Sequence, residues 1–268
     1  MNSIRFTKLL AVAALGAQFS LPVPAQTTLV YVGAYTRPPS KGISAYRFDA
    51  SSGQLTSLGV AAETSNPTFL AVHPSRKFLY AANENPEGAI SAFAIDPSTG
   101  QLKLLNRVGS RGSGPRHAAV DQAGHWLYAA NYNSGSVASF PIRDDGSLGD
   151  AAGVAQHTGS GVNPQRQRGQ HAHSANLAPD GRFLLAADLG LDQIDPAKGT
   201  LTALDRTPTG GQTPRNFAID PSGAWLLAAN QDSGNVVPFR IGPESGRLSA
   251  TGKTIDVASP VCVVFAKP

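Results

Sequence analysis

Two arginines and two histidines lie close together between residues 166 and 173. The stretch reads RQRGQHAH, so Arg166 and Gln167 are followed shortly by His171 and His173. Residues two apart on a β-strand face the same side, so a strand here would direct both imidazoles at one place. Histidine can take a proton from water near neutral pH, and arginine binds carboxylate or phosphate groups. The pattern therefore indicates acid–base chemistry on an anionic substrate, with a metal site and a purely structural role as the alternatives.

Internal repetition shows which elements would position these residues. Four stretches align without gaps, each running from one strand through a turn to a second strand: 67–84, 115–132, 172–189 and 214–231. Alternating segments such as AISAFAID and turns such as PSTGQL follow, which gives units of about 42 to 57 residues, a period typical of propeller blades. The sequence therefore predicts an all-β fold, a β-propeller of four-stranded antiparallel blades, with five blades.

The two ends of the chain predict how the ring closes. The first unit opens at Leu29 with LVYVGAYT and lacks the inner strand that the other units have, whereas the chain ends with SPVCVVF. We expect this last strand to supply the missing inner strand and so to close the ring, which removes exposed sheet edges. The single cysteine, Cys262, lies in that strand and is expected to be a buried apolar side chain.

Composition limits the compartment and the partners. Residues 1–25 have a basic start, an apolar stretch and small residues before Gln26, which is the pattern of a secretory signal peptide. We expect a single propeller domain over residues 26–268, periplasmic or secreted, with no membrane attachment once the signal is removed, because no later stretch has the roughly 20 apolar residues of a spanning helix. The formal net charge of +4 would fall to about +2 without the signal. No basic run indicates nucleic-acid binding.

The repeat alignment places the candidate site residues at the central channel. His173 aligns with Thr68, Arg116 and Arg215 at the start of an inner strand, and inner strands line the channel of a propeller. Arginine at these positions disfavours a bound cation, so we predict no metal; no cofactor motif is present either. The remaining candidates for substrate contact are His117, next to Arg116, and Glu84, at the end of a second strand.

Several motifs together resemble the lactonase family of seven-bladed propellers, which includes the propeller-type 6-phosphogluconolactonases and carboxy-muconate cyclase. The motifs are YVGAYT, NPTFLAVHP, FLYAANE, QHTGSG with HAHS, ADLGLD, TPRNFAIDP and SPVCVVF, and they cover nearly the whole chain after residue 25. Arg166 and Gln167 match the family's loop motif. The fourth unit, residues 171–205, is truncated, because Gly199 follows Asp188 by 11 residues whereas Gly246 follows Asn230 by 16. The resemblance therefore implies that about two blades of the family are absent here, and we expected the remaining five to close at a tighter angle.

The resemblance implies an exported, monomeric lactonase that hydrolyses a sugar lactone, with a non-phosphorylated aldonolactone as the better match to export. His171 or His173 would be the general base. The residues expected to bind the substrate are Arg116, His117, Arg166, Gln167, Arg215 and Glu84. The alternative is a non-catalytic propeller, either a binding or interaction module or an inactive truncated homologue.

Overall fold

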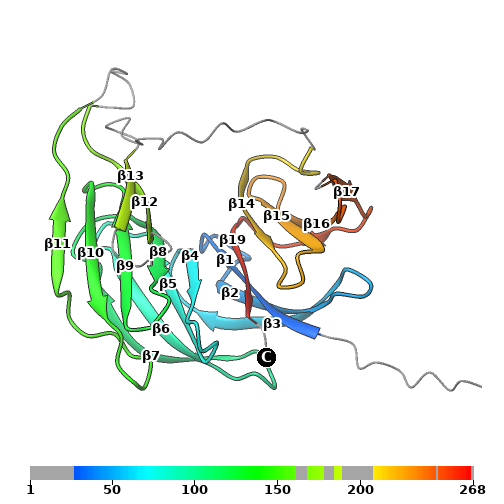
Figure 1. The fold of residues 1–268 in the computed structure, drawn as a ribbon, viewed down its shortest axis with the longest axis horizontal. Helices are drawn as coiled ribbons and strands as arrows, with labels where there is room; N and C mark the ends of the chain where they lie inside the picture. Colours follow the sequence, from blue (N-terminus) through cyan, green and yellow to red (C-terminus); the bar gives the residue numbers. More distant parts are fainter. Residues whose placement is uncertain (1–26, 161–167, 178–183, 189–207, 246, 267–268) are drawn as a thin grey trace, which may run out of the picture.

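A computed structural model describes residues 27–160, 168–177, 184–188, 208–245 and 247–266, and within these ranges all regular structure is β-strand (Figure 1). The strands form five antiparallel sheets. The first sheet has the order β19 (Pro260–Ala266), β1 (Thr27–Ala34), β2 (Gly42–Asp49) and β3 (Gln54–Glu63). The second consists of β4 (Pro67–Val72), β5 (Phe78–Asn83), β6 (Ala89–Ile95) and β7 (Leu102–Gly109). The third consists of β8 (Pro115–Val120), β9 (Trp126–Asn131), β10 (Ser136–Pro141) and β11 (Gly153–Gln156).

The last two sheets complete the set. The fourth pairs β12 (Ala172–Leu177) with β13 (Leu184–Asp188). The fifth consists of β14 (Pro214–Ile219), β15 (Trp225–Asn230) and β16 (Asn235–Ile241), with β17 (Leu248–Ala250) and β18 (Ile255–Asp256) both paired to β16. The predicted all-β propeller is confirmed, and each of the five units corresponds to one sheet. Residues 189–205 of the fourth unit and the predicted signal peptide, 1–25, lie outside the described residues.

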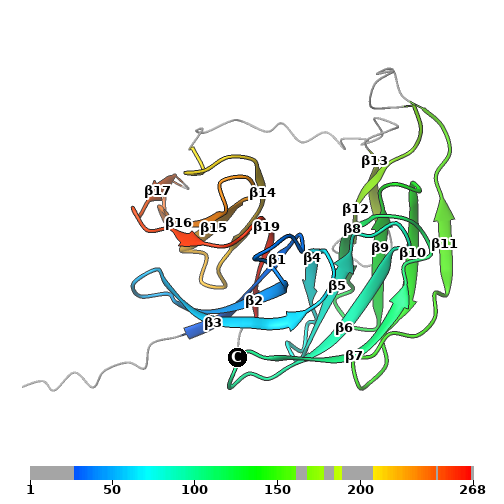
Figure 2. The ribbon, with the colours of Figure 1, turned by 180° about the vertical axis from the view of Figure 1, so that it is seen from behind.

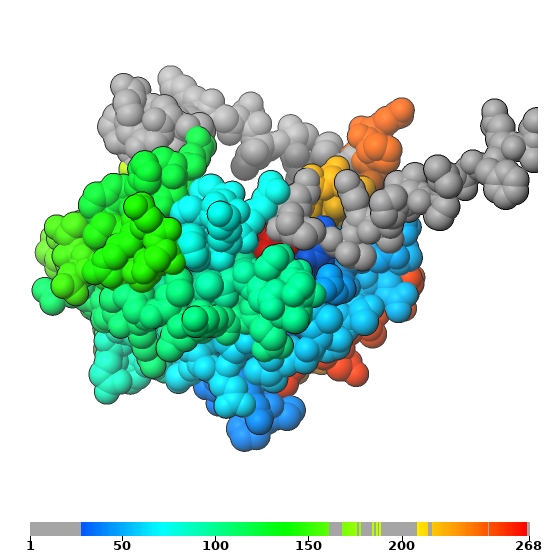
Figure 3. Space-filling model, turned by 90° about the horizontal axis from the view of Figure 1, so that it is seen from below, coloured from blue at the N-terminus to red at the C-terminus, as the bar shows by residue number. Residues whose placement is uncertain are grey.

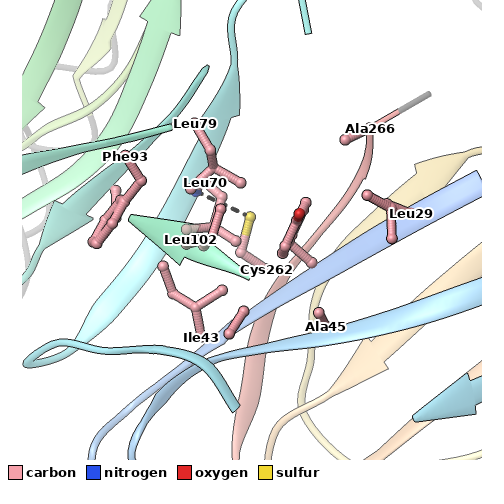
Figure 4. Close-up of a cluster of buried hydrophobic side chains, with 12 residues drawn as sticks. Leu29, Ile43, Ala45, Leu70, Leu79, Phe93, Leu102, Cys262 and Ala266 are labelled. Carbon is pink, nitrogen blue, oxygen red and sulfur yellow. Dashed lines mark hydrogen bonds between the residues drawn. The ribbon is translucent and has the colours of Figure 1, made fainter. Parts of the chain in front are cut away.

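The C-terminal strand completes the first sheet, as the sequence predicts. β19 pairs antiparallel with β1, in a register that sets Leu29 opposite Ala266 and Gly33 opposite Cys262. Cys262 is fully buried among apolar side chains, and its Sγ accepts a hydrogen bond from the main-chain nitrogen of Leu70 at 3.3 Å (Figure 4). Burial raises the pKa of the Cys262 thiol to about 12, so the residue packs as a small apolar group.

The core lies between neighbouring sheets. Tyr31 of β1, Leu70 of β4 and Leu79 of β5 belong to the cluster that joins the first two sheets, and Phe140 of β10 belongs to the cluster that joins the second and third. Seen from below, the first three sheets follow one another without a break (Figure 3). The apolar residues of the alternating strand pattern therefore hold the sheets face to face, as propeller blades require.

The inner strands pack side by side in the order β14, β19, β4, β8, β12. Figures 1 and 2 show these strands along an arc, and within the described residues no comparable packing joins β12 to β14. At the β14 end of the arc, the side chains of Phe217 and Ile219 are exposed by 63% and 53%. The fifth sheet therefore presents apolar side chains where the arc ends.

Candidate functional site

Each sheet has the same irregularity at the start of its inner strand. The pairing register shifts by one residue at this point, which is a β-bulge. The residues left out of the pairing are Thr68, Arg116, His173, Arg215 and Val261. A bulge turns a side chain away from the regular alternation of the strand. The bulges therefore lie at the starts of the inner strands, and four of the five bulged positions are those that the repeat alignment brought together.

The local sequence explains the bulge. In four of the five sheets the inner strand begins with proline, which has no N–H to donate to a sheet and is tolerated at bulges. The residue before each of these prolines has a positive φ; these residues are Asn66 (42°), Gly114 (63°), Thr213 (54°) and Ser259 (49°). A left-handed residue followed by proline thus breaks the regular ladder at the same place in these four sheets, whereas β12 has its bulge without a proline.

A small cavity of about 80 Å³ lies at these bulges. Its lining residues are Thr68, Phe69, Glu84, Arg116, His117, His173, Asn216 and Val261. Four of the predicted site residues, Glu84, Arg116, His117 and His173, are therefore brought together. His171 lies beside this group without lining the cavity. The side chain of Arg215 and the whole of Arg166 and Gln167 lie outside what the structure describes.

Arg116 is held between a carboxylate and an aromatic ring. Its guanidinium is 2.9 Å from Glu84, whose side chain is only 10% exposed, and its Cζ lies 4.1 Å from the centroid of the Tyr132 ring. The hydroxyl of Tyr35 donates to the other carboxylate oxygen of Glu84 at 2.9 Å. These contacts fix the arginine at the rim of the cavity by an ion pair and a cation–π interaction.

Two buried polar atoms at the cavity have no hydrogen-bond partner in the described part of the chain. They are Nε of Arg116 and Oγ1 of Thr68. Leaving a buried donor unpaired costs about 1 to 3 kcal/mol. A ligand that accepts from these donors would recover this energy, so the cavity favours an oxygen-rich molecule.

The two histidines of the HAH segment both contact Tyr132. The His171 ring stacks on the Tyr132 ring, with centroids 4.6 Å apart, and its Nδ1 lies 3.1 Å from the main-chain oxygen of Tyr132. Because a carbonyl oxygen only accepts, Nδ1 of His171 carries a proton, and in the neutral ring Nε2 then keeps its lone pair. His173 meets the same ring edge-on at 5.7 Å. Both imidazoles therefore contact one ring, but His171 precedes β12 and His173 is at the bulge, so the prediction that they lie two apart on one strand is wrong.

Asp188 contacts both His171 and His157. Its carboxylate accepts a hydrogen bond from the main-chain nitrogen of His171 at 2.7 Å and lies 2.6 Å from Nδ1 of His157. The equivalent residues of the other units are asparagines, which donate instead to main-chain oxygens of the loop before the inner strand; these are Asn83, Asn131 and Asn230. The fourth unit thus replaces an amide by a carboxylate beside the histidines.

His117 lines the cavity and packs against the Phe69 ring. Burial, with a smaller effect of the nearby His173, lowers the pKa of its imidazole to about 4. His117 is therefore neutral at physiological pH. Among the described residues no group of three histidine, cysteine or carboxylate side chains is arranged to hold a metal ion.

Tyr35, Tyr132, Thr68 and Asn216 were not predicted as site residues. Tyr132 occupies the repeat position of Glu84, directly after the recurring asparagine, and Thr68 aligns with Arg116. The repeat alignment thus contained a signal for both. Tyr35 and Asn216 contribute through contacts between different sheets, which no local pattern reveals.

In the described ranges, no helix is long and apolar enough to cross a membrane.

The fold and the site define a β-propeller with a polar cavity at the bulged ends of its inner strands. The family profile described as "Lactonase, 7-bladed beta-propeller" matches residues 29–195 and 193–265. The chain therefore belongs to this lactonase family. It is similar to the 6-phosphogluconolactonase of Bacillus subtilis strain 168, with 26% identity over 340 aligned positions that cover 88% of this chain and 97% of that protein.

Solved structures show the same relationship. The periplasmic gluconolactonase of Pseudomonas aeruginosa is 26% identical, with a TM-score of 0.82 over 90% of this chain and 100% of the other. A putative 6-phosphogluconolactonase from Bacteroides fragilis is 27% identical, also with a TM-score of 0.82, over 90% of this chain and 98% of the other. These proteins are what the chain resembles in sequence and fold.

The comparisons also explain the arc. Since 88% of 268 residues is about 236, roughly 100 of the 340 aligned positions have no counterpart in this chain, which is close to two repeat units. The two solved structures nevertheless superpose on 90% of this chain with TM-scores of 0.82, and the matches span 98% and 100% of those chains. The spacing of the five sheets is thus that of a seven-bladed propeller, and the tighter angle that we expected for five blades is wrong.

Proposed function

We propose that the protein is an exported lactonase that opens a sugar lactone by hydrolysis at the cavity between the inner-strand bulges. The observation that carries this proposal is the convergence of His173, Arg116 and Thr68 on one cavity, with the donors of Arg116 and Thr68 unpaired. An imidazole can activate water, and fixed donors can bind the oxygen on which negative charge develops. Membership of the lactonase family supports the reaction class.

In this proposal His173 is the general base. The imidazole takes a proton from water while the water oxygen attacks the lactone carbonyl carbon, and the carbonyl oxygen becomes an oxyanion near Arg116. When the tetrahedral intermediate collapses, the bond from the carbonyl carbon to the ring oxygen breaks, and the imidazolium returns the proton to that oxygen. The products are a carboxylic acid and a hydroxyl on one open chain, and the acid releases its proton to solvent to become a carboxylate. His171, held by Tyr132, is the alternative base, and its unprotonated Nε2 supports that assignment.

The substrate class follows from charge and compartment. Arg116 is paired with the carboxylate of Glu84, so the cavity offers less net positive charge than a phosphate would require. Arg215, Arg166 and Gln167 are proposed to bind the substrate's outer hydroxyl or acidic groups. The likeness to a periplasmic gluconolactonase supports export and a non-phosphorylated aldonolactone. We propose a monomer that uses no metal or cofactor.

A lactone panel tests the proposal. Purified protein is assayed in a pH-stat with gluconolactone and 6-phosphogluconolactone, and the variants His171→Ala and His173→Ala are compared with the wild type. Loss of the base should lower kcat by about 100-fold or more, with the circular dichroism spectrum unchanged. We expect faster hydrolysis of gluconolactone than of its 6-phosphate, and the reverse order would contradict the substrate assignment.

A non-catalytic role remains the second candidate. The roughly 100 aligned positions that this chain lacks relative to the Bacillus protein favour it, because absent blades remove part of the channel wall. Folded protein that binds lactones without hydrolysing any of them would support a binding module.

A further inference from the structure

Inner strands are joined by a repeated hydrogen bond that involves the residue after the bulge in three of the five sheets. Cys262 accepts from the main-chain nitrogen of Leu70 at 3.3 Å, and Oδ1 of Asn216 accepts from that of Val263 at 2.9 Å. His117 occupies the equivalent position in the third sheet, and its Nδ1 accepts from the main-chain nitrogen of Ala175 at 3.3 Å. In all three cases the donor lies four residues into the next inner strand. The bond is therefore a recurring part of how the sheets are joined.

This bond fixes the proton on the other nitrogen of His117. A main-chain N–H can only donate, so Nδ1 must keep its lone pair, and the proton of the neutral ring is on Nε2. The Phe69 ring covers the imidazole, with ring centroids 4.2 Å apart, which further disfavours a charged ring. Within the described residues Nε2 has no hydrogen-bond partner, and His117 lines the cavity beside Arg116 and His173.

We propose that His117 is a neutral N–H donor that binds the carbonyl oxygen of the substrate through Nε2 and stabilises the oxyanion that forms there. This role rests on the lactonase activity proposed above. His117 exchanges no proton in the reaction, because Nδ1 remains bonded to Ala175 and Nε2 keeps its proton throughout. Each of the three cavity residues then has its own role. His173 transfers the proton, His117 donates a hydrogen bond to the oxyanion, and Arg116 supplies positive charge.

Nitrogen NMR of protein labelled with ¹⁵N-histidine tests the tautomer directly. Two other histidines serve as internal references. Nδ1 of His73 accepts a hydrogen bond from the main-chain nitrogen of Ser75, and its Nε2 contacts the main-chain oxygen of Gly124, so the neutral ring is the Nε2–H tautomer. The neutral ring of His171 is the Nδ1–H tautomer, because its Nδ1 contacts a main-chain oxygen. The His117 signals, assigned by their loss in His117→Asn, should show the Nε2–H pattern that the neutral His73 ring gives at pH 8 and should keep it from pH 8 to pH 6. A His171-like pattern, or an imidazolium in this range, would overturn the proposal.

Two variants test the catalytic role. His117→Asn keeps an acceptor for the main-chain nitrogen of Ala175, as Asn216 provides one in the fifth sheet. His117→Phe introduces the residue type that Phe69 has at the equivalent position of the second sheet, and it removes both the acceptor and the donor. We expect kcat of His117→Phe to fall about 100-fold, the scale of losing one oxyanion donor, with KM changed less than about threefold. The circular dichroism spectra of both variants should match that of the wild type, which checks that the fold is retained. An unchanged kcat in folded His117→Phe would overturn the role. If the wild type hydrolyses no lactone, the proposed function fails and the catalytic role with it, whereas the NMR result still decides the tautomer.

Discussion

Acidification should destabilise the folded protein through His117, and the size of the effect can be worked from the structure. Burial lowers the pKa of this imidazole from 6.5 to about 4. Below pH 6.5 the unfolded chain takes up a proton that the folded state does not bind. The free energy of unfolding therefore falls by about 1.4 kcal/mol per pH unit until pH 4, and by about 3 kcal/mol in total. This contribution is fully present above pH 6.5 and is lost as the pH falls towards 4.

Urea unfolding at pH 7.0 and pH 5.0 measures the effect, with His117→Asn as the matched control. Between these values the wild type should lose about 2 kcal/mol more than the variant, because only the wild type has the buried imidazole. Carboxylates that titrate in this range are common to both proteins, so their contributions cancel in the difference. Equal losses in the two proteins would refute the argument that His117 is held neutral by burial.

Four further outcomes are expected. Arg116→Gln should weaken binding of anionic lactones more than of neutral ones in initial-rate assays, because a charge-assisted bond is lost; an equal effect on both would contradict this. Phe140→Ala should lower the free energy of urea unfolding by about 3 to 5 kcal/mol, since the ring is fully buried. Gly53→Ala should lower the thermal midpoint, because φ is +68° and an added Cβ would overlap the Trp225 ring; the cost is at least about 1 kcal/mol. EDTA should leave hydrolysis unchanged, whereas loss of activity restored by a divalent ion would contradict the acid–base assignment.

The fold was predictable because its signal repeats. The aligned stretches identified the sheets and the shared position of Thr68, Arg116 and His173, which the structure identifies as the bulge. The completion of the first sheet by the last strand followed from the half-unit at Leu29. The angle between sheets was predicted wrongly, because it depends on side-chain packing between neighbouring sheets rather than on the number of units.

The site was predictable only in part. Residue type and repeat position indicated Glu84, Arg116, His117 and His173, and all four line the cavity. The tautomer of His117 could not be predicted, because it depends on a main-chain donor 58 residues further along the chain. Contacts of this kind arise only when neighbouring sheets pack together, and no periodicity in the sequence encodes them.

Hydrolysis of gluconolactone by the wild type and by His173→Ala, followed in a pH-stat, tests the central claim most directly. The claim is that the bulged inner strands assemble an acid–base site around the cavity. We expect wild-type turnover that falls by about 100-fold or more in a variant with an unchanged circular dichroism spectrum. Equal turnover in the two proteins, or no hydrolysis by folded wild-type protein, would contradict the account.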